Sequence, residues 1–181
     1  DTRNQIAYAV AQKAKRGTKT AAEGGYAPKN VLVLGCSTGY GLASRISAAF
    51  EYGADTIGVS FEKEATETKA GTPGFYNNMT YDKEAQKAGL KSKTFNMDAF
   101  SDECRQAVID EAKKQGIKFD LIIYSLASPV RTDPDTKVMY RSVIKPIGST
   151  FTGPALDMMT GKIAVQEVKP AEGDDIPNTV K

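Results

Sequence analysis

One glycine-rich segment of the sequence has a spacing suited to binding phosphate. It reads Gly35-Cys36-Ser37-Thr38-Gly39-Tyr40-Gly41, a Gly-x-x-x-Gly-x-Gly pattern. Gly35 would let the chain turn tightly, Gly39 would let the backbone approach a pyrophosphate, and Gly41 would let the next helix pack close to a sheet. The segment follows an apolar run and opens a predicted helix, so free backbone N–H groups would face the pyrophosphate. This context favours a ligand site over a glycine-rich turn that binds nothing.

A carboxylate stands where a dinucleotide site would need one. The second apolar strand ends at Phe61-Glu62, about 20 residues after the glycine segment, where an acid that binds the adenosine ribose is expected. Glu62 could accept hydrogen bonds from the ribose hydroxyls, whereas a 2′-phosphate would face like charge, which favours NAD over NADP. Lys63 beside it acts in the opposite direction. A solvated glutamate at a strand end is the alternative.

Two further strand ends carry candidate contacts. Asp98 follows the third predicted strand and could accept from the adenine amino group, although a turn or helix-capping aspartate is the alternative. The fourth strand ends in Ser125-Leu126-Ala127, where the nicotinamide half would lie unless this is an ordinary strand exit. The predicted dinucleotide contacts are Gly35, Ser37, Thr38, Gly39, Tyr40, Gly41, Phe61, Glu62, Asp98, Ala99, Ser125, Leu126 and Ala127.

Other kinds of reactive site are excluded or disfavoured by the sequence. It contains no histidine, which rules out a Ser-His-Asp triad, a Cys-His pair and a His-ligated metal within this chain. Cys36 sits at a predicted helix N-terminus, which could lower its thiol pKa. We predict instead that Cys36 is a small packing residue, because no base is near it in the sequence. We predict no metal site.

The composition is typical of one globular domain. The chain has 181 residues, of which 40% are hydrophobic and 25% charged. The net charge is +2 and the lysines are scattered, which argues against a nucleic-acid partner. No apolar run approaches the ~18 residues of a membrane span. The two cysteines make no disulfide framework, so we expect a cytoplasmic location.

Alternating strands and helices would position the candidate residues. We predict strands at residues 31–34, 56–61, 92–95 and 119–124, and helices at 4–16, 42–50, 82–88 and 102–115. The first helix would bury Ile6, Val10 and Ala14 and end at Gly17, and Ser101 would cap the last helix. Residues 18–27 and 66–80 are predicted loops, and residues 160–162 a turn between two short strands.

This order predicts an α/β fold, a Rossmann-type doubly wound parallel sheet. We divide the chain into three parts. Residues 1–28 form an N-terminal helix and loop, residues 29–129 the dinucleotide-binding Rossmann core, and residues 130–181 an irregular segment with a hairpin.

Several stretches together resemble the trans-2-enoyl-CoA reductases and the related FabV-type enoyl-acyl-carrier-protein reductases. They are residues 31–45, Gly74-Phe75-Tyr76-Asn77-Asn78, Asp98-Ala99-Phe100, 124–134, Lys145-Pro146 and 150–153. The resemblance covers nearly the whole chain and implies an offshoot of the short-chain dehydrogenases. Such an enzyme reduces the carbon–carbon double bond of trans-2-enoyl thioesters, carried on CoA or acyl carrier protein, with NADH in fatty acid synthesis. It acts as a single chain.

The resemblance also implies residues that this chain lacks. The family's catalytic tyrosine and lysine lie in a Tyr-(x)8-Lys motif after a fifth strand, and no tyrosine here has a lysine nine positions later. Tyr8/Lys15 and Tyr76/Lys83 have the shorter gap of other enoyl reductases but lie outside the expected region. We therefore expect an inactive fragment with no catalytic residue in this chain, truncated after the fourth core strand, with residues 130–181 leading to a missing catalytic part. The alternative is a non-catalytic nucleotide-binding module or a regulatory domain.

Overall fold

A four-stranded parallel sheet forms the centre of the first of two units, Asp1–Ala127. The computed structural model describes residues 1–16 and 25–180, so the predicted helix end at Gly17 and most of the predicted 18–27 loop lie outside the described residues. The strands are β1 (Asn30–Leu34), β2 (Asp55–Ser60), β3 (Ser92–Asn96) and β4 (Leu121–Tyr124), in the order β3-β2-β1-β4. β1 and β2 are the two inner strands, and most of their side chains are buried, as in a sheet covered on both faces.

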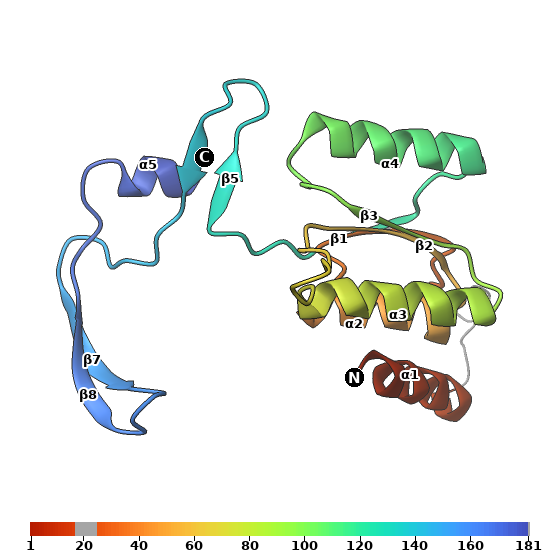
Figure 1. Ribbon diagram of the computed structural model, residues 1–181, viewed down its shortest axis with the longest axis horizontal. Helices are drawn as coiled ribbons and strands as arrows, with labels where there is room; N and C mark the ends of the chain where they lie inside the picture. The colour runs from red at the N-terminus through yellow and green to blue at the C-terminus, as the bar shows by residue number, and fades with distance from the viewer. Residues whose placement is uncertain (17–24, 181) are drawn as a thin grey trace. The chain divides into compact units, whose positions relative to one another are not determined.

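Helices cover both faces of this sheet (Figure 1). On one face lie α2 (Gly39–Ile46), which continues into the π-helical turn η2 (Ser47–Glu51), and α3 (Pro73–Lys87). α4 (Asp102–Gln115) lies on the other face, and α1 (Thr2–Arg16) lies outside α2 and α3. The predicted doubly wound α/β fold is therefore confirmed.

Three clusters of buried side chains hold the layers together. Val31 and Val33 of β1 pack with Cys36, Ala48 and Ala54 beneath α2 and η2. On the opposite face, Leu32, Ile57 and Val59 pack against Cys104 and Val108 of α4. The third cluster joins α1 to α2, η2 and α3, and its members are Ile6, Ala9, Leu42, Ile46, Ala49, Phe50, Tyr81 and Ala85.

The predicted face of the first helix was partly wrong. Ile6 is buried, but Val10 is 49% exposed and Ala14 is also exposed. The buried face is made by Thr2, Ile6 and Ala9 instead. Because Ala9 has a small side chain, it lets α1 approach the third cluster closely, and the branched Val10 is left at the edge of the contact.

The predicted loop at residues 66–80 was wrong over its second half. α3 begins at Pro73, which occupies the first helical turn where a missing N–H costs nothing. Its buried face is Gly74, Asn78, Tyr81 and Ala85. These positions have helical spacing, but only Tyr81 and Ala85 are apolar, so the helix gives a weak hydrophobic pattern. α2 likewise begins at Gly39, three residues before the predicted start.

The second unit, Ser128–Lys181, contains two antiparallel hairpins and a short helix among its described residues. β7 (Phe151–Leu156) pairs with β8 (Ile163–Val168), and Gly161 turns the chain between them with φ +66°, as predicted for residues 160–162. β5 (Val130–Thr132) and β6 (Met139–Arg141) form a hairpin that the sequence did not predict, followed later by α5 (Asp175–Val180).

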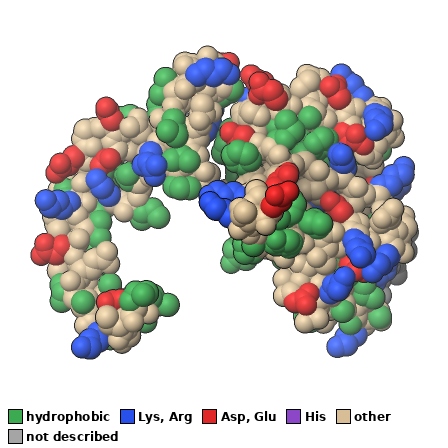
Figure 2. All heavy atoms as spheres, in the orientation of Figure 1, with side chains coloured by type: hydrophobic (Ala, Val, Ile, Leu, Met, Phe, Trp, Pro, Cys, Tyr) green, Lys and Arg blue, Asp and Glu red, His purple; other side chains and the backbone are tan. Residues whose placement is uncertain are grey.

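Charged side chains of both signs are interspersed on the face of the molecule shown in Figure 2, rather than gathered into one basic patch. This distribution agrees with the scattered lysines of the sequence. Among the described residues, the helices all fall short of the length and apolar character that crossing a membrane requires.

Candidate functional site

The predicted site residues meet at one edge of the sheet because the strands that precede them are parallel. β1 pairs with β2 on one side and with β4 on the other, and β2 pairs with β3. The carboxyl ends of all four strands therefore share one edge, where ligands of open α/β sheets bind. The glycine segment follows β1, Phe61 and Glu62 follow β2, Asp98 follows β3, and residues 125–127 follow β4.

Two glycines of the segment are required by close backbone contacts. A Cβ on Gly35, whose φ is +87°, would lie well within 3.0 Å of the Ser125 carbonyl oxygen. A Cβ on Gly41 would lie equally close to the Gly35 carbonyl oxygen. The N–H groups of Gly35 and Cys36 donate to the Val59 carbonyl oxygen, at 2.9 and 3.0 Å. These contacts pack the turn after β1 tightly between the end of β2 and the exit of β4.

Gly39 differs, because its Cα faces open space. Its φ is +53°, and no heavy atom of the described residues lies within 4 Å of where its Cβ would be. The first backbone bond of α2 runs from the Leu42 N–H to the Thr38 carbonyl oxygen, so the N–H groups of Gly39, Tyr40 and Gly41 have no partner within the helix. Open space beside such N–H groups at a helix N-terminus is the environment that a pyrophosphate requires.

Glu62 lies beside the glycine segment and is fixed at several points. Ser37 Oγ donates to Glu62 Oε1 at 2.5 Å, and Thr72 Oγ1 donates to Oε2. Its backbone exchanges two hydrogen bonds with the Asn96 side chain, at 2.7 and 3.0 Å. The acid is half-buried, so its carboxylate is ordered yet accessible at the edge of the sheet.

The remaining predicted contacts occupy the same edge in different ways. Phe61 is 78% exposed and Tyr40 is 89% exposed, which leaves both rings available to a ligand. Asp98 Oδ1 accepts from the Phe100 N–H at 2.9 Å, the turn role that was the alternative for this residue. The Ser125 N–H donates to the Leu34 carbonyl oxygen at 2.8 Å and so continues the pairing of β4 with β1. Ligand contacts by these side chains stay predictions.

Cys36 is a packing residue, as predicted. It is wholly buried, and burial raises the pKa of its thiol despite the nearby Arg45 guanidinium. Its Sγ donates to Asn78 Oδ1 and accepts from Arg45 Nη1, both at 3.6 Å. The thiol therefore stays protonated and joins the segment to α2 and α3.

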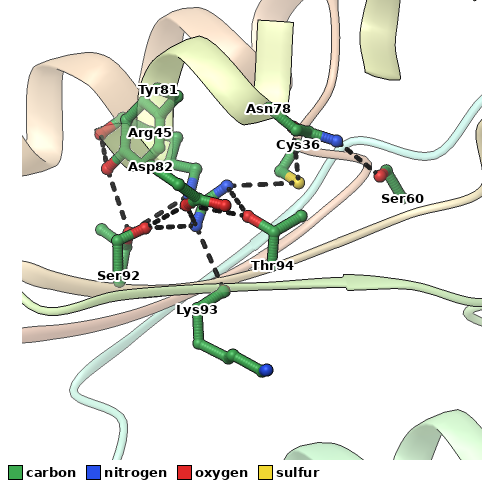
Figure 3. Close-up of polar contacts among 10 residues, drawn as sticks. Cys36, Arg45, Ser60, Asn78, Tyr81, Asp82, Ser92, Lys93 and Thr94 are labelled. Atoms are coloured by element: carbon green, nitrogen blue, oxygen red, sulfur yellow. Dashed lines mark hydrogen bonds and ion pairs between the residues drawn. The ribbon is translucent and has the colours of Figure 1, made fainter. Parts of the chain in front are cut away.

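Sequence reasoning missed the residues that support the site from behind. Arg45, wholly buried, extends from α2 across the sheet and donates to Thr56 and Thr94 at 3.1 and 2.9 Å, and its guanidinium lies 4.1 Å from the Tyr81 ring centre (Figure 3). Its further partners are Asp82, Ser92 and the Lys93 carbonyl oxygen. Because Gly58 has no side chain, it leaves space for this guanidinium. A sequence signal was available, since Gly58 interrupts an otherwise bulky strand.

Asn78 is the second missed residue. Its Nδ2 donates to Ser60 Oγ at 2.8 Å while its Oδ1 accepts from Cys36, so one buried amide connects α3 to the ends of β1 and β2 (Figure 3). An asparagine inside a helix is normally expected on a solvated face, and no pattern around Asn78 indicates the opposite.

Comparison with known proteins identifies the family. The description "Trans-2-enoyl-CoA reductase catalytic region" matches residues 69–181, and "NAD(P)H binding domain of trans-2-enoyl-CoA reductase" matches residues 1–67. The chain belongs to the trans-2-enoyl-CoA reductase family. It therefore carries the family's NAD(P)H-binding domain, and the match to the catalytic region begins before β3, inside the Rossmann sheet.

Individual relatives support this assignment. The chain is 62% identical over 167 residues to trans-2-enoyl-CoA reductase [NADH] of Treponema denticola, covering 92% of this chain and 42% of that protein. It is 50% identical over 178 residues to enoyl-[acyl-carrier-protein] reductase [NADH] of Flavobacterium psychrophilum, covering 98% of this chain and 42% of the relative. The crystal structure of the Treponema denticola reductase in complex with NAD superposes with a TM-score of 0.90 at 57% identity, over 99% of this chain and 45% of that one. The chain thus spans less than half the length of these relatives.

Proposed function

We propose that this chain forms the NADH-binding part of a single-chain, cytoplasmic reductase of fatty acid synthesis. The whole enzyme would reduce the trans-2 double bond of enoyl thioesters carried on CoA or on acyl carrier protein, two carriers that occur in the names of the relatives. The observation that carries the proposal is the open face of Gly39 beside the fixed carboxylate of Glu62.

The residues present fit a dinucleotide. The N–H groups at the start of α2, which have no partner within the helix, and the positive end of the helix dipole suit a pyrophosphate. The Glu62 carboxylate suits the hydroxyls of the adenosine ribose, and the exit of β4 at Ser125 suits the nicotinamide half. NADH, when bound, supplies the hydride for the reduction. The chain's own part is to bind and orient it through the thirteen contacts predicted above.

Glu62 supports NADH over NADPH. A 2′-phosphate at the ribose would stand against a carboxylate that two hydroxyls hold in place, and like charges at close range repel. We expect residues 1–181 to bind NADH more tightly than NADPH when each is titrated by its own fluorescence. Equal dissociation constants at moderate salt would contradict the proposed cofactor.

A non-catalytic nucleotide-binding module is the second candidate, favoured by one observation. No tyrosine of this chain has a lysine nine positions later, which is the pair that the family resemblance requires. The coding sequence distinguishes the two functions. A reading frame that continues beyond Lys181 into Tyr-(x)8-Lys supports the reductase, and a stop codon at that point supports the module.

A further inference from the structure

The Glu62 carboxylate is oriented by hydroxyl groups from two different parts of the chain. Ser37, in the glycine segment, holds one carboxylate oxygen at 2.5 Å, and Thr72, immediately before α3, holds the other. Ser37 is 6% exposed, so its hydroxyl has little freedom to turn away. The direction in which this acid points therefore depends on residues other than the acid itself.

The beginning of α3 provides the space for the carboxylate. A Cβ on Gly74 would lie well within 3.0 Å of Glu62 Oε1, so the carboxylate occupies the volume that any other residue would fill. This position beside the first turn of α3 also places the negative charge at the positive end of the helix dipole. Thr72 and Gly74 thus form a close-fitting site for the Glu62 carboxylate.

Asn77, in the next turn of α3, hydrogen-bonds to Ser37, which in turn hydrogen-bonds to Glu62. Its Nδ2 donates to the Ser37 carbonyl oxygen at 3.0 Å. Its Oδ1 accepts from Thr2 Oγ1 of α1 at 2.9 Å. Ser37 is therefore fixed at its carbonyl by Asn77 and at its hydroxyl by Glu62, and the Asn77 amide is itself oriented from behind by Thr2.

We propose that Asn77 is a positioning residue for dinucleotide discrimination, an inference that rests on the proposed NADH site. By fixing Ser37, Asn77 keeps the Glu62 carboxylate directed at the position of the ribose 2′ group. A fixed acid accepts from the hydroxyls of NADH and opposes the phosphate of NADPH without having to be ordered on binding. A Glu62 carboxylate that is no longer fixed could turn toward solvent. This would reduce its repulsion of the NADPH 2′-phosphate more than it would reduce the affinity for NADH.

The test compares the ratio of the NADPH and NADH dissociation constants in variants of residues 1–181. Asn77→Ala removes the donor to Ser37, and this ratio should fall about three- to tenfold, the effect of losing one intramolecular hydrogen bond. Thr72→Val removes the other hydroxyl on Glu62 at nearly constant volume and should lower the ratio in the same direction. The matched control is Thr80→Val, which removes a hydroxyl of the same helix that donates to the Tyr76 carbonyl oxygen at 2.9 Å, so the ratio should stay near that of the unaltered chain.

The melting temperature without nucleotide separates positioning from a general structural role. If Asn77 had only a structural role, Asn77→Ala would lower the melting temperature and weaken the binding of both nucleotides equally. An unchanged ratio of the two dissociation constants would therefore overturn the inference. A fall in Thr80→Val as large as in Asn77→Ala overturns it as well. Should Asn77→Ala fail to fold, Asn77→Leu, which keeps most of the side-chain volume without the donor to the Ser37 carbonyl oxygen, decides the outcome through the same ratio. An unaltered chain that binds neither nucleotide refutes the proposed function itself, whereas one that prefers NADH while its variants keep the full ratio refutes only the role of Asn77.

Discussion

The Cα of Gly35 is pressed so closely against the Ser125 carbonyl oxygen that no side chain fits between them. This contact joins the turn after β1 to the exit of β4 and fixes two parts of the candidate site relative to each other. Gly39 has the opposite environment, with open space where its Cβ would lie. The same segment therefore contains one glycine that the fold requires and one whose open side is available to a ligand.

Replacing Gly39 with valine should remove dinucleotide binding while the sheet stays folded. The branched side chain would enter the space that we assign to the pyrophosphate. Because φ is +53° at this position, the unfavourable backbone should cost about 1–2 kcal/mol of stability, too little to unfold most domains. The measurement is an NADH titration together with a thermal melt.

Gly35→Ala is the matched control for this variant. Its Cβ would collide with backbone rather than with a flexible side chain, so it should lower the melting temperature strongly. A folded Gly39→Val chain with unaltered NADH affinity would show that the segment is not the binding site.

The contact of Gly58 with Arg45 predicts a coupled pair of substitutions. A Cβ on Gly58 would lie 2.6 Å from the Arg45 guanidinium carbon and 2.7 Å from Cys36 Sγ. Gly58→Ala should therefore destabilise the chain by about 1–3 kcal/mol through overpacking. In an Arg45→Met background the same substitution should cost less, because the clashing guanidinium is gone. Denaturant unfolding of the four chains measures the coupling, and strictly additive losses would contradict it.

The order of elements was predictable because it depends on apolar strands and on glycine and serine positions. Ser101 accepts from the Cys104 N–H at 3.1 Å and caps α4, as its place before an acidic first turn predicted. The carboxyl edge of the sheet followed from the parallel order alone. For this reason the candidate residues could be chosen from the sequence before their surroundings were known.

The sequence did not predict which polar side chains are buried. Arg45 and Asn78 are types usually found on the surface, yet both are buried here because hydroxyls, a thiol and carbonyls from several elements surround them. The first half of α3 was missed for a related reason, since Gly74 and Asn78 replace apolar residues on its buried face. Pairings between residues far apart in sequence decide these positions, and local pattern does not report them.

The buried thiol predicts a loss of stability at alkaline pH. Burial raises the pKa of Cys36 above its ordinary value of 9.0, so the unfolded chain releases this proton at a lower pH than the folded chain does. Stability from this group is then present below the ordinary value and is lost as the pH rises toward the folded value. The free energy of unfolding should fall more between pH ~8 and pH ~10 in the unaltered chain than in Cys36→Ala.

Urea unfolding at the two pH values measures this difference. Tyr81 and Cys104, whose pKa values burial also raises, are common to both chains, so most of their contribution is removed by the comparison. An equal fall in the two chains would mean that the Cys36 thiol does not titrate differently on unfolding.

The last prediction concerns catalysis by the chain itself. Residues 1–181 should show no measurable enoyl-thioester reductase activity even where they bind NADH, because the Tyr-(x)8-Lys pair is absent from the sequence and there is no histidine to replace the tyrosine. Reduction of an enoyl thioester places negative charge on the thioester oxygen, and losing one donor to such an oxygen typically lowers the rate by ~10²–10³-fold. Loss of the tyrosine, the lysine and the walls of a substrate pocket should lower it further.

The assay is oxidation of NADH in the presence of crotonyl-CoA, by residues 1–181 and by a longer chain that includes the pair. Turnover by residues 1–181 within about tenfold of the longer chain, a smaller loss than one missing donor would cause, would place the catalytic residues inside this sequence. The first candidates would then be Tyr124, which is 64% exposed, and the adjacent Ser125 at the exit of β4.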